Sequence, residues 1–230
     1  MSSSERTAEE AKADYQAKMG EDIGAVYSAL WQEVASIHKK WGQYFQLFGT
    51  NPERIAVMNQ AAPSMFRTVQ DTLFENVLLH LARLTDPPRS TGKTNLSLHH
   101  LANLLVTSPI GSNVEALAKS ALTACEFARD WRNRKLAHRD LCVALGQGVE
   151  PLAPASRAAV KSALEVLDAI LNVVSDHYLG STTMFELGPS GEDAISLLYL
   201  LRDGLQLRED RLTRIKRGEL RYIDLNPEPL

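Results

Sequence analysis

The chain has 230 residues, of which 44% are hydrophobic and 23% charged, and its formal net charge is −3. This length is ample for a buried core, either in one domain with an appendage or in two small domains, and the composition is typical of a globular protein. A slightly acidic chain excludes a surface that attracts nucleic acid everywhere, so any site for a polyanion must be a local basic patch.

The short apolar runs of the sequence also argue against a membrane-spanning protein. The longest uninterrupted apolar runs, Leu141–Leu145 and Leu197–Leu201, contain five residues each, whereas a membrane span needs about 20. The start of the chain, Met1–Arg6, is polar and no apolar segment follows it, which argues against a signal peptide. The two cysteines form no Cys-x-x-Cys pair. These features favour a reduced, cytoplasmic setting without a membrane.

The first half of the chain is predicted to be helical. Apolar residues recur mostly every three or four positions over Ile23–Phe48, which predicts one long amphipathic helix that Gly49 stops. Asn51 and Pro52 together form a typical helix start, with Asn as the N-cap. The helical pattern then continues over residues 54–84, with a break or kink at Pro63.

The second half shows the same helical periodicity between short polar loops. Asp86-Pro87-Pro88 ends the preceding helix, and no segment has a convincing strand pattern. Ser112 and Glu115 form a capping box, which predicts the start of a helix. The expected segments are a loop at Arg89–Thr94, a helix at Asn95–Leu105, a helix from Ser112 to Arg139, a loop at Leu141–Pro154, a helix at Ser156–Leu179 stopped by Gly180, and a last helix at Ser190–Arg217 stopped by Gly218.

Helical patterns joined by mostly short loops predict an all-α fold, an antiparallel bundle. We expect residues 1–180 to form the bundle. Residues 181–218 then add one C-terminal helix that packs on the bundle or extends from it, and residues 219–230, with two prolines, form a loose tail.

The segment from Arg132 to His138 carries the clearest indication of chemistry. It lies in a basic stretch, residues 129–140, in which Asp130 and Asp140 are the acids and the basic residues are Arg129, Arg132, Arg134, Lys135 and Arg139. His138 follows Arg132 by six positions, or roughly 240° around an ideal helix. The two side chains therefore converge only if the helix ends or bends near Ala137, or if a second subunit supplies the missing half.

An arginine and a histidine brought together suit phosphodiester chemistry. Arginine can hold a phosphate through two parallel charged hydrogen bonds, and histidine exchanges a proton near neutral pH. A base that deprotonates the 2′-hydroxyl of RNA lets it attack the adjacent phosphate without a metal ion, and Asn133 could orient the phosphate or the nucleophile. The alternative is structural: cations are common at helix C-termini, where they suit the helix dipole.

Arg132 and His138, separated by five residues of which the first is Asn133, resemble the signature of the HEPN superfamily of helical RNA-processing proteins. The match is closest to the abortive-infection, AbiU-like branch, which the stretches Leu81–Pro87 and Asn95–Leu98 also resemble. The resemblance covers about Ile23–Leu179 and leaves out the last helix. It implies a metal-independent endoribonuclease with Arg132 and His138 as catalytic residues, acting as a homodimer that joins two motifs in one cleft.

The leading hypothesis is therefore a prokaryotic defence or toxin endoribonuclease that needs no cofactor. Arg132 would stabilise the transition state, His138 would act as general base or acid, and Asn133 would position the phosphate. RNA is the expected partner, bound electrostatically by Arg129, Arg134, Lys135 and Arg139, and a neighbouring antitoxin protein is a further candidate. Many HEPN proteins have lost catalysis, so the alternative is a non-catalytic module that binds RNA or a protein as a dimer. The third hypothesis is a helical interaction protein in which the motif is only a charged helix end.

Other motifs predict no further site. Gly92-Lys93-Thr94 lacks the earlier glycine of a phosphate-binding loop, since Pro87 stands there and no strand precedes it. His80, His99 and His100 lack acids or cysteines at ligand spacing, so no metal is expected. Cys125 and Cys142 are most simply small buried hydrophobes. The basic end of the last helix, residues 208–217, is best explained as a mixed-charge solvent face.

Overall fold

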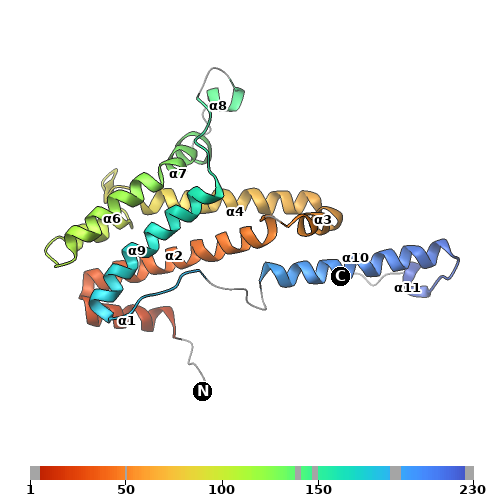
Figure 1. The fold of residues 1–230 in the computed structure, drawn as a ribbon, viewed down its shortest axis with the longest axis horizontal. Helices are drawn as coiled ribbons and strands as arrows, with labels where there is room; N and C mark the ends of the chain where they lie inside the picture. Colours follow the sequence, from red (N-terminus) through yellow and green to blue (C-terminus); the bar gives the residue numbers. More distant parts are fainter. Residues whose placement is uncertain (1–5, 50, 138–140, 147–149, 187–192, 226–230) are drawn as a thin grey trace. The chain divides into compact units, whose positions relative to one another are not determined.

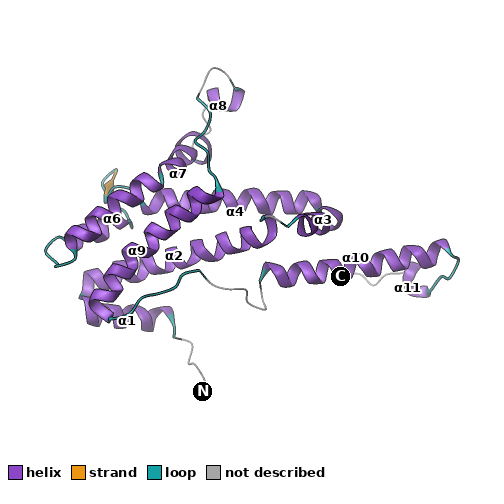
Figure 2. Ribbon diagram, viewed as in Figure 1, coloured by secondary structure: helices purple, strands orange, loops and turns teal. Residues whose placement is uncertain are grey.

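The computed structural model describes residues 6–49, 51–137, 141–146, 150–186 and 193–225, and these are almost entirely helical (Figures 1 and 2), which confirms the all-α prediction. The helices are α1 (Ala8–Met19), α2 (Glu21–Phe48), α3 (Pro52–Ala61), α4 (Pro63–Leu84), α5 (Leu98–Leu104), α6 (Gly111–Ala124), α7 (Glu126–Trp131), the π-helical turn η1 (Arg132–Leu136), α8 (Leu141–Leu145), α9 (Arg157–Leu179), α10 (Ala194–Lys216) and α11 (Tyr222–Leu225). A two-stranded hairpin, β1 (Arg89–Ser90) and β2 (Lys93–Thr94), lies between α4 and α5.

The chain divides into two compact units. The first unit comprises Met1–Trp41 and Phe74–Leu187, and the second comprises Gly42–Leu73 and Gly188–Leu230. Residues 42–73 thus group with α10, although the sequence places them in the middle of the predicted bundle. The predicted domain boundary after residue 180 stays a prediction, because grouping by contacts does not test which segments fold independently.

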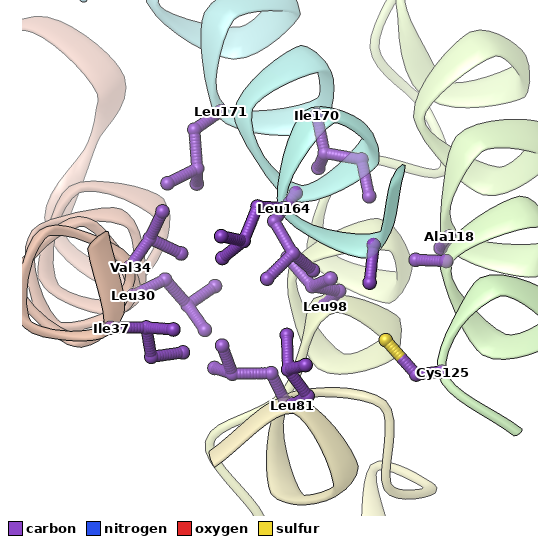
Figure 3. Close-up of a cluster of buried hydrophobic side chains, with 14 of the residues drawn as sticks. Leu30, Val34, Ile37, Leu81, Leu98, Ala118, Cys125, Leu164, Ile170 and Leu171 are labelled. Atoms are coloured by element: carbon purple, nitrogen blue, oxygen red, sulfur yellow. The ribbon is translucent and has the colours of Figure 1, made fainter. Parts of the chain in front are cut away.

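The first unit is built around a continuous apolar core. Helices α2, α4, α5, α6, α7 and α9 each contribute fully buried side chains to it. Figure 3 labels ten of the core residues: Leu30, Val34, Ile37, Leu81, Leu98, Ala118, Cys125, Leu164, Ile170 and Leu171. Burial of these side chains removes apolar surface from water, which is the dominant favourable term in folding. This core fixes α4, α5 and α7, the elements that carry the candidate site.

The second unit has a smaller core and an incompletely covered helix. Met58 of α3 and Leu198 of α10 pack in a cluster with Leu47 and Phe66. Farther along α10, large apolar side chains remain in contact with solvent, and Leu200 is 72% exposed. Helix α11 packs back on α10, where the buried side chain of Asp224 binds two arginines of α10.

Several predicted helix ends are confirmed. The long helix ends at Phe48, and the side chain of Asn51 accepts hydrogen bonds from the backbone of the first turn of α3. Pro63 separates α3 from α4, as its missing N–H and its ring require. Gly180 caps α9 with φ of 63°, in the left-handed region that glycine enters at little cost.

The predicted capping box at Ser112 is wrong. Helix α6 begins at Gly111, its N-cap is Ile110, and no side chain caps it. A tight turn that follows α5 brings the backbone N–H of Gly111 to Ser108 O at 2.9 Å, and a Cβ at Gly111 would lie 2.3 Å from Leu105 O. The close approach of the turn, rather than a side-chain cap, therefore sets this helix start.

The single helix predicted from Ser112 to Arg139 is also wrong. The chain bends at Cys125, which is fully buried, and continues as α7 and then as η1. The bend lets both α6 and α7 place side chains, such as Ala121 and Ala128, in the same core. Packing at a buried residue thus outweighs the local helical pattern.

Three further elements lie outside the predicted pattern. The predicted loop at 89–94 contains the β1–β2 hairpin, the predicted loop at 141–154 contains α8, and the predicted tail contains α11. Helix α1 was not predicted either, and its backbone passes so close to α2 that a Cβ at Gly24 would lie 2.4 Å from Gln16 N. Tertiary contacts stabilise α1 and α11, and an apolar period does not reveal such contacts.

Candidate functional site

The motif begins where the regular helix gives way to a π-helical turn. In η1 the backbone N–H of Ala137 donates to Arg132 O at 2.8 Å, and the helix ends at Leu136. The sequence required an end or bend near Ala137 for the motif to converge, and that requirement is met. Single π-helical turns are frequently found at functional sites. His138 and Arg139 lie outside the described residues.

Arg132 is held by two side chains. Its Nη1 donates to Asp86 Oδ1 at 2.6 Å, and its Nε donates to Asn133 Oδ1 at 3.0 Å. The Arg132 side chain is 18% exposed, so it is largely withdrawn from water but still reachable. A guanidinium has five N–H donors, and the partners found among the described residues leave Nη2 available for a ligand.

Arg129, one turn earlier, shares the same carboxylate. Its Nη1 donates to Asp86 Oδ1 at 3.2 Å and to the backbone oxygen of Thr85 at 3.0 Å. The hydroxyl of Thr85 is buried and donates to backbone oxygens of Leu81 and Ala82, which fixes the end of α4. Asp86 thus holds two arginines, and the local sum of these three groups is one positive charge. We call Asp86, Arg129 and Arg132 the Asp86 clip.

Arg134 hydrogen-bonds the backbone of a segment that lies 16 residues later in the chain. Its Nη1 lies 3.2 Å from Asp130 Oδ1, and its Nη2 donates to the backbone oxygen of Glu150. Asp130 Oδ2 in turn accepts the backbone N–H of Ala153 at 2.8 Å, and Trp131 Nε1 donates to the oxygen of Ala153 at 2.8 Å. These bonds fasten the segment before α9 to α7 and η1.

Lys135 is the most exposed of the described motif cations. Its Nζ lies 3.0 Å from Glu75 Oε1 and 4.6 Å from the centre of the Trp131 ring, and its side chain is 42% exposed. Trp131 itself packs edge-to-face against Phe74 of α4. An exposed ion pair of this kind contributes little to stability, so Lys135 can exchange Glu75 for a phosphate at small cost.

A model of the AbiU2 family, a HEPN family, matches residues 20–194 of the chain. The chain belongs to the AbiU2 family of HEPN proteins. The resemblance inferred from the motif and from the upstream stretches is thereby confirmed, and the match extends beyond α9 to the first residue of α10. No curated protein and no solved structure matches the chain.

The geometry adds residues to those that sequence reasoning selected for this AbiU2 family member. Each described cation of the motif has a carboxylate partner, and sequence reasoning missed the roles of Asp86, Asp130 and Glu75. Asp86 lies in the stretch Leu81–Pro87, which resembles the AbiU-like branch, and this resemblance was the one sequence signal that pointed to it. The roles in RNA binding predicted for Arg129, Arg134 and Lys135 stay predictions.

An open depression lies beside the Asp86 clip. It has a volume of about 320 Å³ and is lined by Thr85, Pro87, Pro88, His99, Leu122 and Arg129. Burial is the main cause that lowers the pKa of His99, and the nearby charges of Arg129 and Lys119 lower it further. His99 is therefore mainly neutral at pH 7.

The described residues contain no group of three or more His, Cys, Asp or Glu side chains that could hold a metal ion. Burial raises the pKa of the Cys125 thiol to about 12, so this cysteine stays protonated and unreactive. Cys142, in contrast, is exposed. Within the described part of the chain, every helix is too short or too polar to cross a bilayer.

Proposed function

We propose that this AbiU2 family member is a metal-independent endoribonuclease of a prokaryotic defence or toxin type. The observation that carries the proposal is the placement of Arg132. A largely buried guanidinium is fixed by Asp86 and Asn133 at a helix end, and the next position but one after that end is His138. An arginine held in this way is organised in advance for a phosphate, which is the condition for electrostatic catalysis.

In the proposed reaction the 2′-hydroxyl of RNA attacks the adjacent phosphorus. His138 accepts the proton of the hydroxyl or donates one to the leaving 5′-oxygen, and Arg132 binds the oxygens that gain charge in the transition state. Asn133 orients Arg132, because its Oδ1 accepts the Nε proton of Arg132, and its Nδ2 positions the phosphate. The bond from phosphorus to the 5′-oxygen breaks, which leaves a 2′,3′-cyclic phosphate and a 5′-hydroxyl.

The assembly and setting are part of the same proposal. We expect a homodimer in which two motifs form one cleft, a cytoplasmic protein and, as a possible partner, an antitoxin protein. The family supports these expectations. One positive charge left over at the Asp86 clip is the local feature that favours RNA as the partner on an otherwise acidic chain.

The test is cleavage of single-stranded RNA by the purified protein in EDTA. We expect wild-type protein to yield 2′,3′-cyclic phosphate ends, and Arg132→Ala and His138→Ala each to lower the rate about 10²–10³-fold, as loss of one preorganised group in a transition-state site does. Lys161→Ala is the control, because Lys161 of α9 is exposed and has only a weak pair with Glu165 at 3.9 Å. Cleavage by His138→Ala at the wild-type rate, or no cleavage by the wild type, contradicts the proposal.

One observation favours a second function, a non-catalytic HEPN module. The side chains of Arg134 and Asp130 hydrogen-bond the backbone of Glu150 and Ala153, so this part of the motif stabilises the fold. A binding or assembly module would need only this structural role of the motif and no catalysis. It would bind RNA or a protein partner equally well as wild type and as His138→Ala.

A further inference from the structure

The depression beside the Asp86 clip has the composition of a site for a flat, weakly polar group. Pro87, Pro88 and Leu122 give it apolar walls, and His99 adds an aromatic ring. Arg129 stands at its edge and is fixed by its bonds to Asp86 and Thr85. Proteins that read single-stranded RNA stack its unpaired bases on rings and guanidinium planes of this kind.

The β1–β2 hairpin continues directly from the wall of this depression. Pro88 lines the depression and the next residue, Arg89, begins β1. Asn95 clamps the hairpin, since its Nδ2 donates to Pro87 O at 2.8 Å and to Ser90 Oγ at 2.9 Å. The turn residues Thr91 and Gly92 have φ of 45° and 79°, which closes the hairpin tightly.

The cations of the hairpin differ from those of the motif. Arg89 and Lys93 are exposed, and the described residues offer neither of them a carboxylate partner. Arg129, Arg132, Arg134 and Lys135 all have one. A phosphate that binds the hairpin therefore displaces no ion pair, so the hairpin is the better electrostatic contact for a nucleic-acid backbone.

We propose that the depression binds an unpaired base of single-stranded RNA and that Arg89 and Lys93 bind the adjoining phosphates. The proposal rests on the proposed function, because it places the strand that the motif would cut. It also accounts for two features that the cleavage chemistry leaves unused, the neutral ring of His99 and the clamped hairpin. The RNA strand lies along the end of α4, where Asp86 binds both Arg132 and Arg129, and Arg129 lines the depression.

The experiment measures binding without cleavage. A short fluorescein-labelled oligonucleotide of mixed sequence, 2′-O-methylated throughout, lacks the attacking hydroxyl, so its fluorescence anisotropy reports affinity whether or not the protein cuts RNA. We expect His99→Ala to weaken binding about fivefold to a hundredfold, the loss seen when one stacked base loses its platform. His99→Phe, which keeps a flat ring, should restore most of the affinity.

The hairpin is tested by Arg89→Ala combined with Lys93→Ala. This double variant should lower the slope of log affinity against log salt by about 1.4, since each phosphate contact to a single strand contributes about 0.7. The matched control removes two other exposed cations of the same unit, Lys12→Ala with Lys161→Ala, and should leave the slope unchanged. Because both hairpin side chains are exposed, these variants are expected to fold.

Three results would overturn the proposal. They are hairpin and His99 variants that bind like the control, an abasic strand that binds as tightly as the intact one, and a free mononucleotide that competes as well as the strand at equal concentration. Loss of RNA cleavage with unchanged binding of the methylated strand would instead refute the proposed catalysis and leave the binding site standing.

Discussion

Two carboxylates of this protein hold arginines in nearly the same way. Asp86 binds Nη1 of Arg129 at 3.2 Å and Nη1 of Arg132 at 2.6 Å, while Asp224 lies 3.5 Å from Nε of Arg211 and 2.7 Å from Nη2 of Arg214. In both cases the arginines are three positions apart on a helix, so they share one face. An Arg-x-x-Arg pair that shares a carboxylate is therefore not by itself a mark of function.

The surroundings of the two carboxylates differ. Asp224 lies ten residues from Arg214 and fastens α11 to α10. Asp86 lies 46 residues from Arg132, at the end of another helix, beside a depression and a hairpin with exposed cations. The comparison teaches that the tertiary setting of a charge pair, rather than the pair itself, identifies a candidate site.

The largest expected effect is a loss of folding stability, and it should differ between a core residue of the first unit and an exposed residue of the second. Leu98 in the first unit is fully buried, whereas Leu200 in the second is 72% exposed. Leu98→Ala should lower the free energy of unfolding by about 2–5 kcal/mol because it leaves a cavity in the core, and Leu200→Ala should change it by less than about 0.5 kcal/mol. Urea unfolding followed by circular dichroism measures both. Equal losses would show that Leu200 is buried in solution, which contradicts its exposure on α10.

The next effect compares the two carboxylates directly. Asp86→Asn removes a charged partner of Arg132 with little change of shape, and a hydrogen bond to a charged group contributes about 1.5–3 kcal/mol. We expect RNA cleavage to fall about tenfold to a hundredfold, mainly in kcat, because the arginine loses its orientation rather than its contact with RNA.

The matched variant is Asp224→Asn, which removes the same charge from the other arginine pair. It should leave the cleavage rate within about twofold of the wild type, as expected for a substitution away from a reacting centre. If Asp224→Asn lowered the rate as much as Asp86→Asn does, the distinction between the two carboxylates would fail.

The smallest expected effect is a pH dependence of the attachment of α11 to α10. The hydrogen bond from Arg214 is the main cause that holds the pKa of Asp224 below its usual 3.8. A carboxylate with a lowered pKa stabilises the folded state above its unfolded value and loses that contribution as pH falls through its folded value. We expect α11 to lose its attachment to α10 only below about pH 3.8.

A carboxyl titration followed by NMR measures this. The midpoint of Asp224 should lie below 3.8 in the wild type and return toward its usual value in Arg214→Ala. A wild-type midpoint at or above the usual value would show that the tail does not rest on this ion pair in solution.

Local rules predicted much of the helical framework. The apolar period found α2 and α9, and residues with fixed conformational demands, Asn51, Pro63 and Gly180, marked ends that the structure confirms. The spacing of Arg132 and His138 required a helix end near Ala137, and η1 ends there. The all-α fold followed from these patterns, and the family from the resemblance of the Arg132–His138 motif and the two upstream stretches, which the family match confirms.

Non-local contacts account for what the sequence could not predict. The partner of Arg132 lies 46 residues earlier in the chain, and a carboxylate at that distance carries no periodic signal. The bend at Cys125 and the start of α6 at Gly111 depend on close packing with other segments. Helix α1 lacks an apolar stripe, and its start at a capping box of Thr7 and Glu10 is a local signal that sequence reasoning missed.

The bonds from Asp130, Trp131 and Arg134 to the backbone at Glu150 and Ala153 have a consequence for engineering. Ala137 ends the described part of the motif, and Glu150 and Ala153 bind back to the same helices, so the excursion between Ala137 and Glu150 has its two ends held near one another. Doubling the length of such an excursion costs only about 0.6 kcal/mol of closure entropy. The described helix of this excursion, α8, is therefore a natural place to graft a reporter peptide or an affinity handle, because an insertion there leaves His138 and the helices that carry Arg132 unchanged.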